Sequence, residues 1–176
     1  MNKIFIGMAL VFLNFNIMVG YFNVGLLPDF VGYFFILKGI TELSGLSVRL
    51  YKMTPTVLIV GAFSAMVYVM ELLGGLGAGV AGHIVMLVSI NLSLFISYNF
   101  IMGLQDIEMH RKQDLNVARL FLAWKILAVG AFLPLVVRLT PVPEIVAIAA
   151  GFAVGVYFLF ELNKSRRLLY LQNPTE

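Results

Sequence analysis

Six predominantly apolar stretches run along the chain, separated by links that are polar or rich in glycine and proline. An apolar stretch of about 18 residues or more is typical of a helix that spans a membrane. The pattern predicts six helices, over residues 4–22, 28–43, 55–73, 80–104, 117–137 and 144–162. The second is short for a span and the fourth is long. We therefore expect an all-α, polytopic membrane helix bundle of six transmembrane helices, forming one domain over residues 1–176.

Two local signals bear on where these helices begin. The pair Thr54-Pro55 places a proline in the first turn of the third helix, which is a favourable position for that residue. The first apolar run follows Lys3 and therefore looks like a signal peptide. It has no convincing small-x-small cleavage site, and Asn14 and Asn16 interrupt it. We expect it to be retained as the first helix.

The composition excludes a water-soluble fold. The mean hydropathy is +0.97, 61% of the residues are hydrophobic and only 12% are charged. Soluble domains carry about 45–50% apolar and about 25% charged residues, so a soluble chain of this composition would lack the polar groups to cover its surface. Cysteine is absent, which excludes disulfides, thiolate metal sites and redox pairs.

The positions of lysine and arginine predict the orientation. If successive helices alternate in direction, all 12 of these residues except Lys125 and Arg138 fall on the side that carries both termini. The residues on that side are Lys3, Lys38, Arg49, Lys52, Arg111, Lys112, Arg119, Lys164, Arg166 and Arg167. Cytoplasmic loops carry the excess of basic residues, so we expect both termini in the cytoplasm and the chain in the plasma membrane.

Lys125 is the outstanding polar residue, because it lies within the predicted fifth helix. A charge in the hydrocarbon core costs about 2.5–3.5 kcal/mol on insertion scales, so such a residue is a functional candidate by default. It either faces a cavity as a buried cation or reaches toward the cytoplasmic headgroups. Glu42 and Glu161 are its nearest carboxylates in depth, and Lys38 competes for Glu42 from four residues away.

Other polar residues complete the candidates for a solute pathway. The amides nearest the middle of the membrane are Asn14, Asn16 and Asn91, which either line a pathway or bond between helices. Ser89, Ser93 and Ser97 form a stripe on the fourth helix that is open to the same two interpretations. The pathway candidates are Lys125, Asn91, Asn14, Asn16, Glu71 and His83.

An outer layer of charged residues is predicted at the opposite face of the membrane. It consists of Asp29, Glu71, His83, Arg138 and Glu144. These residues either attract a cationic solute or only end helices at the headgroup level, where an acid favours a helix N-terminus. No two metal-ligating residues in this layer share a helical spacing of three or four, so we expect no metal site.

Small residues at helical spacing mark faces where helices approach closely. Ala147, Gly151 and Gly155 are spaced by four on the sixth helix, and Gly61 and Ala65 are spaced likewise on the third. A further series, spaced by seven, is formed by Gly25, Gly32 and Gly39. These faces serve internal packing or a homodimer, which the spacing does not distinguish.

Signatures of an enzyme are absent: the chain has no His-Glu-x-x-His, no Gly-x-Ser-x-Gly and no Walker loop. We expect neither catalysis nor a cofactor. The run Phe15-Asn16-Ile17, followed by Leu26-Leu27-Pro28-Asp29-Phe30-Val31-Gly32-Tyr33, resembles uncharacterised small membrane proteins of Gram-positive bacteria with a Leu-Pro-Asp-Phe-x-Gly-Tyr segment. That resemblance implies no activity. The architecture alone is similar to the substrate-binding subunits of energy-coupling-factor vitamin transporters.

Two hypotheses about function follow. The first is a component that binds or transports a small solute through a cavity lined by some of the pathway candidates. The alternative is a non-transport membrane subunit, immunity or regulatory protein that acts through helix–helix contacts. The expected partners are the lipid bilayer and a membrane or cytoplasmic protein, for which the charged link at residues 105–112 is either a docking surface or a solvated turn. No nucleic-acid partner is expected.

Overall fold

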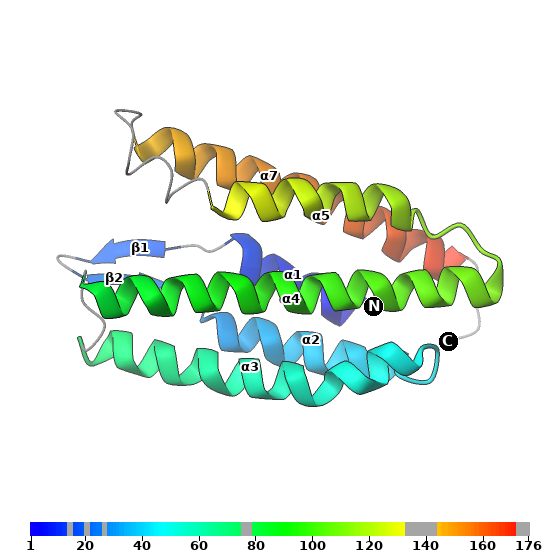
Figure 1. Cartoon of the computed structure of the whole chain (residues 1–176), viewed down its shortest axis with the longest axis horizontal. Helices are drawn as coiled ribbons and strands as arrows, with labels where there is room; N and C mark the ends of the chain where they lie inside the picture. Colours follow the sequence, from blue (N-terminus) through cyan, green and yellow to red (C-terminus); the bar gives the residue numbers. More distant parts are fainter. Residues whose placement is uncertain (14–15, 20–21, 26–27, 75–78, 133–143, 172–176) are drawn as a thin grey trace. The chain divides into compact units, whose positions relative to one another are not determined.

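Six α-helices and one short β-hairpin make up the part of the chain that the structure describes (Figure 1). The structure is a computed structural model and describes residues 1–13, 16–19, 22–25, 28–74, 79–132 and 144–171. These residues group into two compact units, Met1–Asn99 and Phe100–Glu176. The predominantly helical fold agrees with the sequence, whereas the single domain over residues 1–176 stays a prediction.

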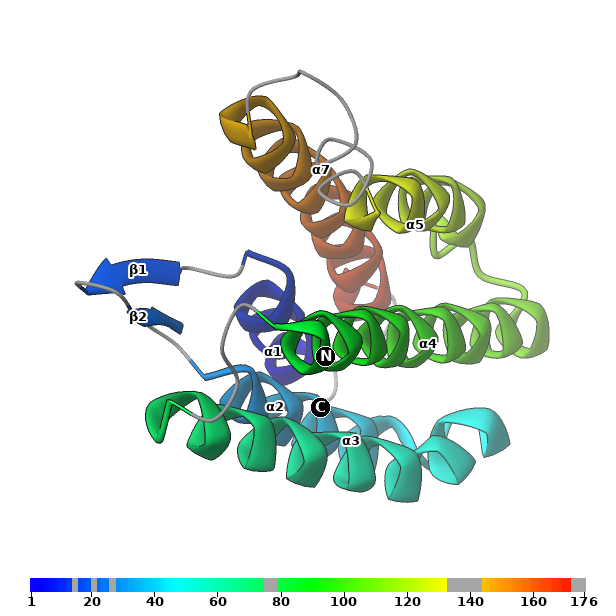
Figure 2. The ribbon, with the colours of Figure 1, turned by 60° about the vertical axis from the view of Figure 1, so that its left-hand side comes forward.

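The N-terminal part differs from the predicted helix over residues 4–22. Helix α1 (Asn2–Leu13) is followed by strands β1 (Asn16–Val19) and β2 (Phe22–Gly25). The strands pair antiparallel, from Asn16 opposite Gly25 to Val19 opposite Phe22, and Figure 2 shows the hairpin beside α1 and α2. The all-helical prediction is therefore wrong for these residues. Branched or aromatic side chains occupy every second position of each strand, which favours the strand conformation. Asparagine side chains compete for the backbone hydrogen bonds of a helix, which disfavours a helix there.

Helices α1 and α2 (Asp29–Leu43) pack at backbone distance through glycines. A Cβ atom added to Gly7 would meet the carbonyl oxygen of Gly32 and lie 2.8 Å from the amide nitrogen of Ile36. One added to Gly39 would lie 2.9 Å from the amide nitrogen of Ile4. The prediction of a close contact at Gly32 and Gly39 is confirmed. The order of these contacts along the chain makes the two helices antiparallel.

Helix α3 (Val48–Leu72) packs on the opposite side of α2. At Gly61, from the predicted packing face of this helix, the Cβ position lies 3.2 Å from the Cβ of Tyr33. The rings of Phe30 and Tyr68 meet edge to face with centroids 5.7 Å apart. Ala65, from the same predicted face, is half-buried. The central helix of this unit therefore has a partner on each side.

The start of α3 differs from the prediction at residue 55. The Ser47 side chain accepts hydrogen bonds from the amides of Arg49, at 3.2 Å, and Leu50, at 3.5 Å, and so caps the helix seven residues earlier. Pro55 lies inside the helix. The serine cap outweighs the proline as a start signal because it satisfies amides that would otherwise have no partner.

Helices α4 (Val80–Arg111) and α7 (Glu144–Leu171) run past their predicted ends at residues 104 and 162. Hydropathy follows the apolar core of a membrane, whereas a helix can continue as long as its residues favour it. Helix α5 (Val117–Ala131) ends earlier than predicted, and the remainder of that segment lies outside the described residues. In the second unit, Gly130 of α5 lies against Val154 of α7, with its Cβ position 3.3 Å from that side chain.

The predicted packing face of α7 receives partial support. Gly155 is buried, but a Cβ atom on Gly151 would meet nothing within 4 Å. The side chain of Ala147 lies outside the described residues. The spacing by four predicts one packing face, but only Gly155 of its two described positions is buried, because periodicity assigns a face to a helix without assigning a neighbour.

Two helices among the described residues, α3 and α4, are long and apolar enough to cross a membrane. Only 17% of the most apolar stretch of α3 is buried, and only 28% of that of α4. Large apolar side chains such as Leu58, Ile59, Ile84 and Val88 are exposed along them. In a soluble protein, a helix this long and apolar would be mostly buried in the core. The exposed apolar faces of α3 and α4 therefore suit a lipid environment.

We expect Gly7→Ala to lower the thermal unfolding midpoint of the protein in detergent. The added methyl group meets the backbone of α2, and overpacking of this kind costs about 1–3 kcal/mol. Gly151→Ala is the matched control, because its methyl group enters open space. Equal midpoints for the two variants would contradict the close approach of α1 and α2.

Candidate functional site

The serine stripe of α4 is bonded within the first unit. The hydroxyls of Tyr33, on α2, and Ser93 lie 2.7 Å apart, and Tyr33 is only 4% exposed. The Ser93 hydroxyl also donates to the carbonyl of Ser89 at 2.8 Å, and the Ser97 hydroxyl donates to the carbonyl of Ser93 at 3.0 Å. These residues tie α4 to α2 and to its own backbone, as the structural interpretation of the stripe requires.

Two pathway candidates of the first unit, Asn91 and His83, contact backbone carbonyls four residues earlier. The Asn91 amide is exposed and donates to the carbonyl of Leu87 at 2.8 Å. His83 lies 2.9 Å from the carbonyl oxygen of Gly79 through its Nδ1 atom. Glu71 is exposed near the end of α3. These three residues share no described cavity, so their role in a pathway stays a prediction.

The structure describes only some of the remaining candidates, which are the outer charged residues and the asparagines predicted near the middle of the membrane. Asp29 is half-buried at the start of α2, and Glu71 is exposed near the end of α3. Asn14 and Arg138 lie outside the described residues, and so do the side chains of Asn16 and Glu144. Among the described residues, no three of the types that ligate metals gather at one place.

Lys125 lies on an exposed, apolar face of α5 in the second unit. Its neighbours on the helix, Leu122, Ile126 and Val129, are all exposed. The Lys125 ammonium lies 4.8 Å from the ring centroid of Phe121, one turn toward the start of the helix. That start is the predicted cytoplasmic end of the helix. The direction agrees with a lysine that reaches toward the headgroups.

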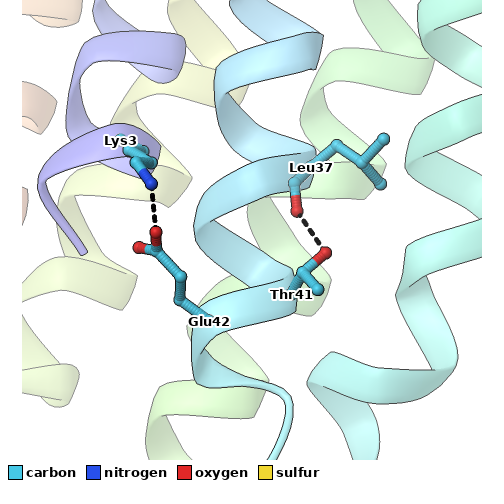
Figure 3. Close-up of polar contacts among 4 residues, drawn as sticks. All are labelled: Lys3, Leu37, Thr41 and Glu42. Atoms are coloured by element: carbon cyan, nitrogen blue, oxygen red, sulfur yellow. Dashed lines mark hydrogen bonds and ion pairs between the residues drawn. The ribbon is translucent and has the colours of Figure 1, made fainter.

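The two carboxylates proposed as partners of Lys125 have other contacts. Glu42 forms an ion pair with Lys3 that joins α1 to α2, as Figure 3 shows. Lys38, the predicted competitor for Glu42, lies with its ammonium 4.4 Å from the ring centroid of Phe34. Glu161 is 6% exposed and accepts a hydrogen bond of 2.7 Å from the side-chain amide of Asn116, at the start of α5.

A groove of about 600 Å³ lies between the start of α3 and the adjoining part of α4, in the first unit. Its lining residues come from both helices. It is lined by Val48, Arg49, Lys52, Met53, Thr56, Phe95, Tyr98 and Asn99. We call these eight residues the α3–α4 groove. The volume falls within the range of about 300–1,000 Å³ that small-molecule sites occupy.

The α3–α4 groove is basic and amphipathic. Arg49 and Lys52 supply two positive charges and are exposed, and none of the lining residues carries a carboxylate. Between Val48 and Asn99 the only acid is Glu71, near the opposite end of α3. Phe95 and Met53 supply apolar surface, and Tyr98 and Asn99 supply polar groups. This combination suits a molecule that is anionic at one end and apolar at the other.

The sequence pattern alone did not reveal this groove. The sequence indicates Arg49 and Lys52 only as part of the basic excess on one side, and it does not single out Phe95 or Tyr98. A usable signal was the pair of cations three residues apart at the start of a helix, in a long stretch that has one acid. Only the fold shows that this turn of the helix lines one groove together with Phe95 and Tyr98.

No family model, curated protein or solved structure matches this chain. Function is therefore inferred from the geometry of its own residues.

We expect Lys125→Met to leave the thermal midpoint in detergent unchanged or to raise it. The substitution removes a charge from an exposed apolar face and keeps a long, flexible side chain. Lys164→Met, at an exposed position of α7, is the matched control for the loss of one charge. A drop of several degrees for Lys125→Met alone would show that Lys125 has a buried partner.

Proposed function

We propose that the chain is an integral protein of the plasma membrane with six transmembrane helices and both termini in the cytoplasm. The length and apolar exposure of α3 and α4 support insertion, and the distribution of lysine and arginine supports the orientation. Helix α1 has 12 residues, about 18 Å at 1.5 Å per residue, which is less than the hydrocarbon thickness of about 30 Å.

The β-hairpin extends the pair of α1 and α2 toward the outer face in this arrangement. Four residues of strand at about 3.3 Å each add about 13 Å, so helix and strand together reach about 30 Å. The open edges of a two-stranded sheet need hydrogen-bond partners that hydrocarbon does not offer. With helix and strand together completing the span, the edges of the hairpin need hydrogen-bond partners from other helices or from the outer headgroups.

We infer that the protein is a non-transport membrane component that acts through contacts with other membrane or cytoplasmic molecules. The observation that carries this proposal is the local engagement of the polar residues that were candidates for a pathway. The Asn91 amide donates to a carbonyl of its own helix, and the Nδ1 atom of His83 lies 2.9 Å from the carbonyl oxygen of Gly79. Lys125 lies over Phe121 on an exposed face. Within the first unit, the groove with cationic lining lies at the predicted cytoplasmic end instead.

Labelling of introduced cysteines tests the six spans, because the natural chain has none. We expect a membrane-impermeant maleimide to label Asn23→Cys, Gly79→Cys and Thr140→Cys in intact cells. Gly45→Cys and Lys164→Cys should react only after the membrane is permeabilised. Added side chains at Gly45 and Gly79 meet nothing within 4 Å, so these two variants should fold normally. Labelling of Gly45→Cys in intact cells would contradict the orientation.

Native mass spectrometry of the tagged protein, purified in a gentle detergent, tests the proposed role. We expect a stoichiometric complex with another membrane protein or with a cytoplasmic protein. A lone protein that carries a small-molecule adduct, lost in Lys125→Met but kept in Lys164→Met, would overturn the proposal in favour of solute binding. The two lysine variants differ only in whether a pathway candidate is removed.

A further inference from the structure

We propose that the second unit binds one alkali-metal cation, Na⁺ or K⁺, at the buried Glu161 and Ser165 of α7, where the α4–α5 link contacts this helix. The link comprises residues 112–116. All of these residues belong to the second unit, so the inference requires neither the placement of the two units nor the proposed function. It goes beyond that function, because it assigns a small ion to a group of buried polar side chains.

Glu161 is a buried acid with few contacts to balance its charge. It is 6% exposed, and its Oε2 atom accepts a hydrogen bond of 2.7 Å from the side-chain amide of Asn116, which is a neutral donor. No lysine, arginine or histidine in the described part of the chain forms an ion pair with it. The nearest cation along the helix, Lys164, is exposed. A buried carboxylate is costly to remove from water, so it needs a counter-charge or several donors.

The Ser165 hydroxyl is a second, independent sign of a ligand. Ser165 follows Glu161 by four residues, so the two side chains lie on the same face of α7. Ser165 is 1% exposed, and its Oγ atom has no hydrogen-bond partner among the described residues. Buried polar groups without a partner are rare and call for an explanation. A ligand on this face of α7 can contact both the Ser165 hydroxyl and the carboxylate of Glu161.

The α4–α5 link has a defined shape and carries another buried oxygen. The amide of Gln113 donates to the carbonyl of Glu108 at 3.2 Å, and the amide of Leu115 donates to the carboxylate of Glu108 at 2.9 Å. Asn116, whose φ of 61° is left-handed, ends the link and bonds to Glu161. The side-chain oxygen of Gln113 is buried and has no partner among the described residues. The link that contacts Glu161 therefore also contains an oxygen that lacks a donor.

An alkali-metal cation suits this set of groups better than other ligands do. Carboxylate, hydroxyl and amide oxygens are ligands of hard cations, whereas transition metals favour histidine and cysteine. The set contains one carboxylate, and no three residues of the metal-ligating types gather among the described residues. One negative charge balances a cation of charge one, whereas calcium sites draw on several carboxylates. An anion would be repelled by Glu161, and a neutral ligand would leave its charge unbalanced.

Thermal unfolding of the full chain in a neutral detergent tests this site. Choline chloride is replaced stepwise by NaCl or by KCl at constant ionic strength, so that general screening by salt stays the same. We expect at least one of the two cations to raise the unfolding midpoint by about 3 °C, with saturation, because a ligand stabilises the state that binds it. Glu161→Gln and Ser165→Ala should each abolish this response. Ser165→Ala changes the side-chain size little, so that variant should fold.

Two matched controls should keep the response of the natural chain. Glu108→Gln removes a carboxylate but keeps an oxygen for the amide of Leu115, and Ser97→Ala removes a buried hydroxyl that already donates to carbonyls. Equal midpoints in choline, sodium and potassium would overturn the proposal. A response that persists in both site variants, or that does not saturate, would overturn it as a general salt effect. These results depend neither on the orientation tested by cysteine labelling nor on a protein partner.

Discussion

The backbone-level approach of α1 and α2 is the contact on which the arrangement of the first unit depends. Gly7, Gly32 and Gly39 leave no room for a side chain between the two helices. In lipid, apolar side chains gain little by leaving their surroundings, so association depends on close packing and on interhelical hydrogen bonds. With α2 held by α1, its other side is free to receive α3 at Gly61 and α4 at Ser93.

Polar groups in the apolar helices are satisfied mainly at short range. Serine, asparagine and histidine side chains of α4 contact carbonyls three or four residues earlier, and Tyr33 joins α2 to Ser93. Such bonds remove the cost of polar groups in a medium without water. They also engage groups that a solute would use, and the proposal of a component that works through its surfaces rests on this. The cations of the α3–α4 groove are the main polar feature of such a surface within the first unit.

The basic residues bear on the proposal in two ways. Lysine and arginine gather at the predicted cytoplasmic ends, and the proposed orientation rests on this excess. Two of them, Arg49 and Lys52, are also brought by α3 against the aromatic residues of α4. Arg49 and Lys52 thus contribute to the predicted orientation and also line a groove beside the apolar surface of a neighbouring helix.

The sequence by itself predicted a membrane protein, its orientation, the positions of most helices and close contacts of small residues at Gly32, Gly39 and Gly61. These follow from hydropathy, charge and residue size, which are local properties of the chain. Only the tertiary structure decided that residues 16–25 form a hairpin, that Ser47 starts α3, that Gly7 is the partner of Gly32 and that Glu42 pairs with Lys3. It also decided that Arg49 and Phe95 line one groove. Periodicity shows which residues share a face of a helix, but the neighbour that meets this face depends on contacts between distant parts of the chain.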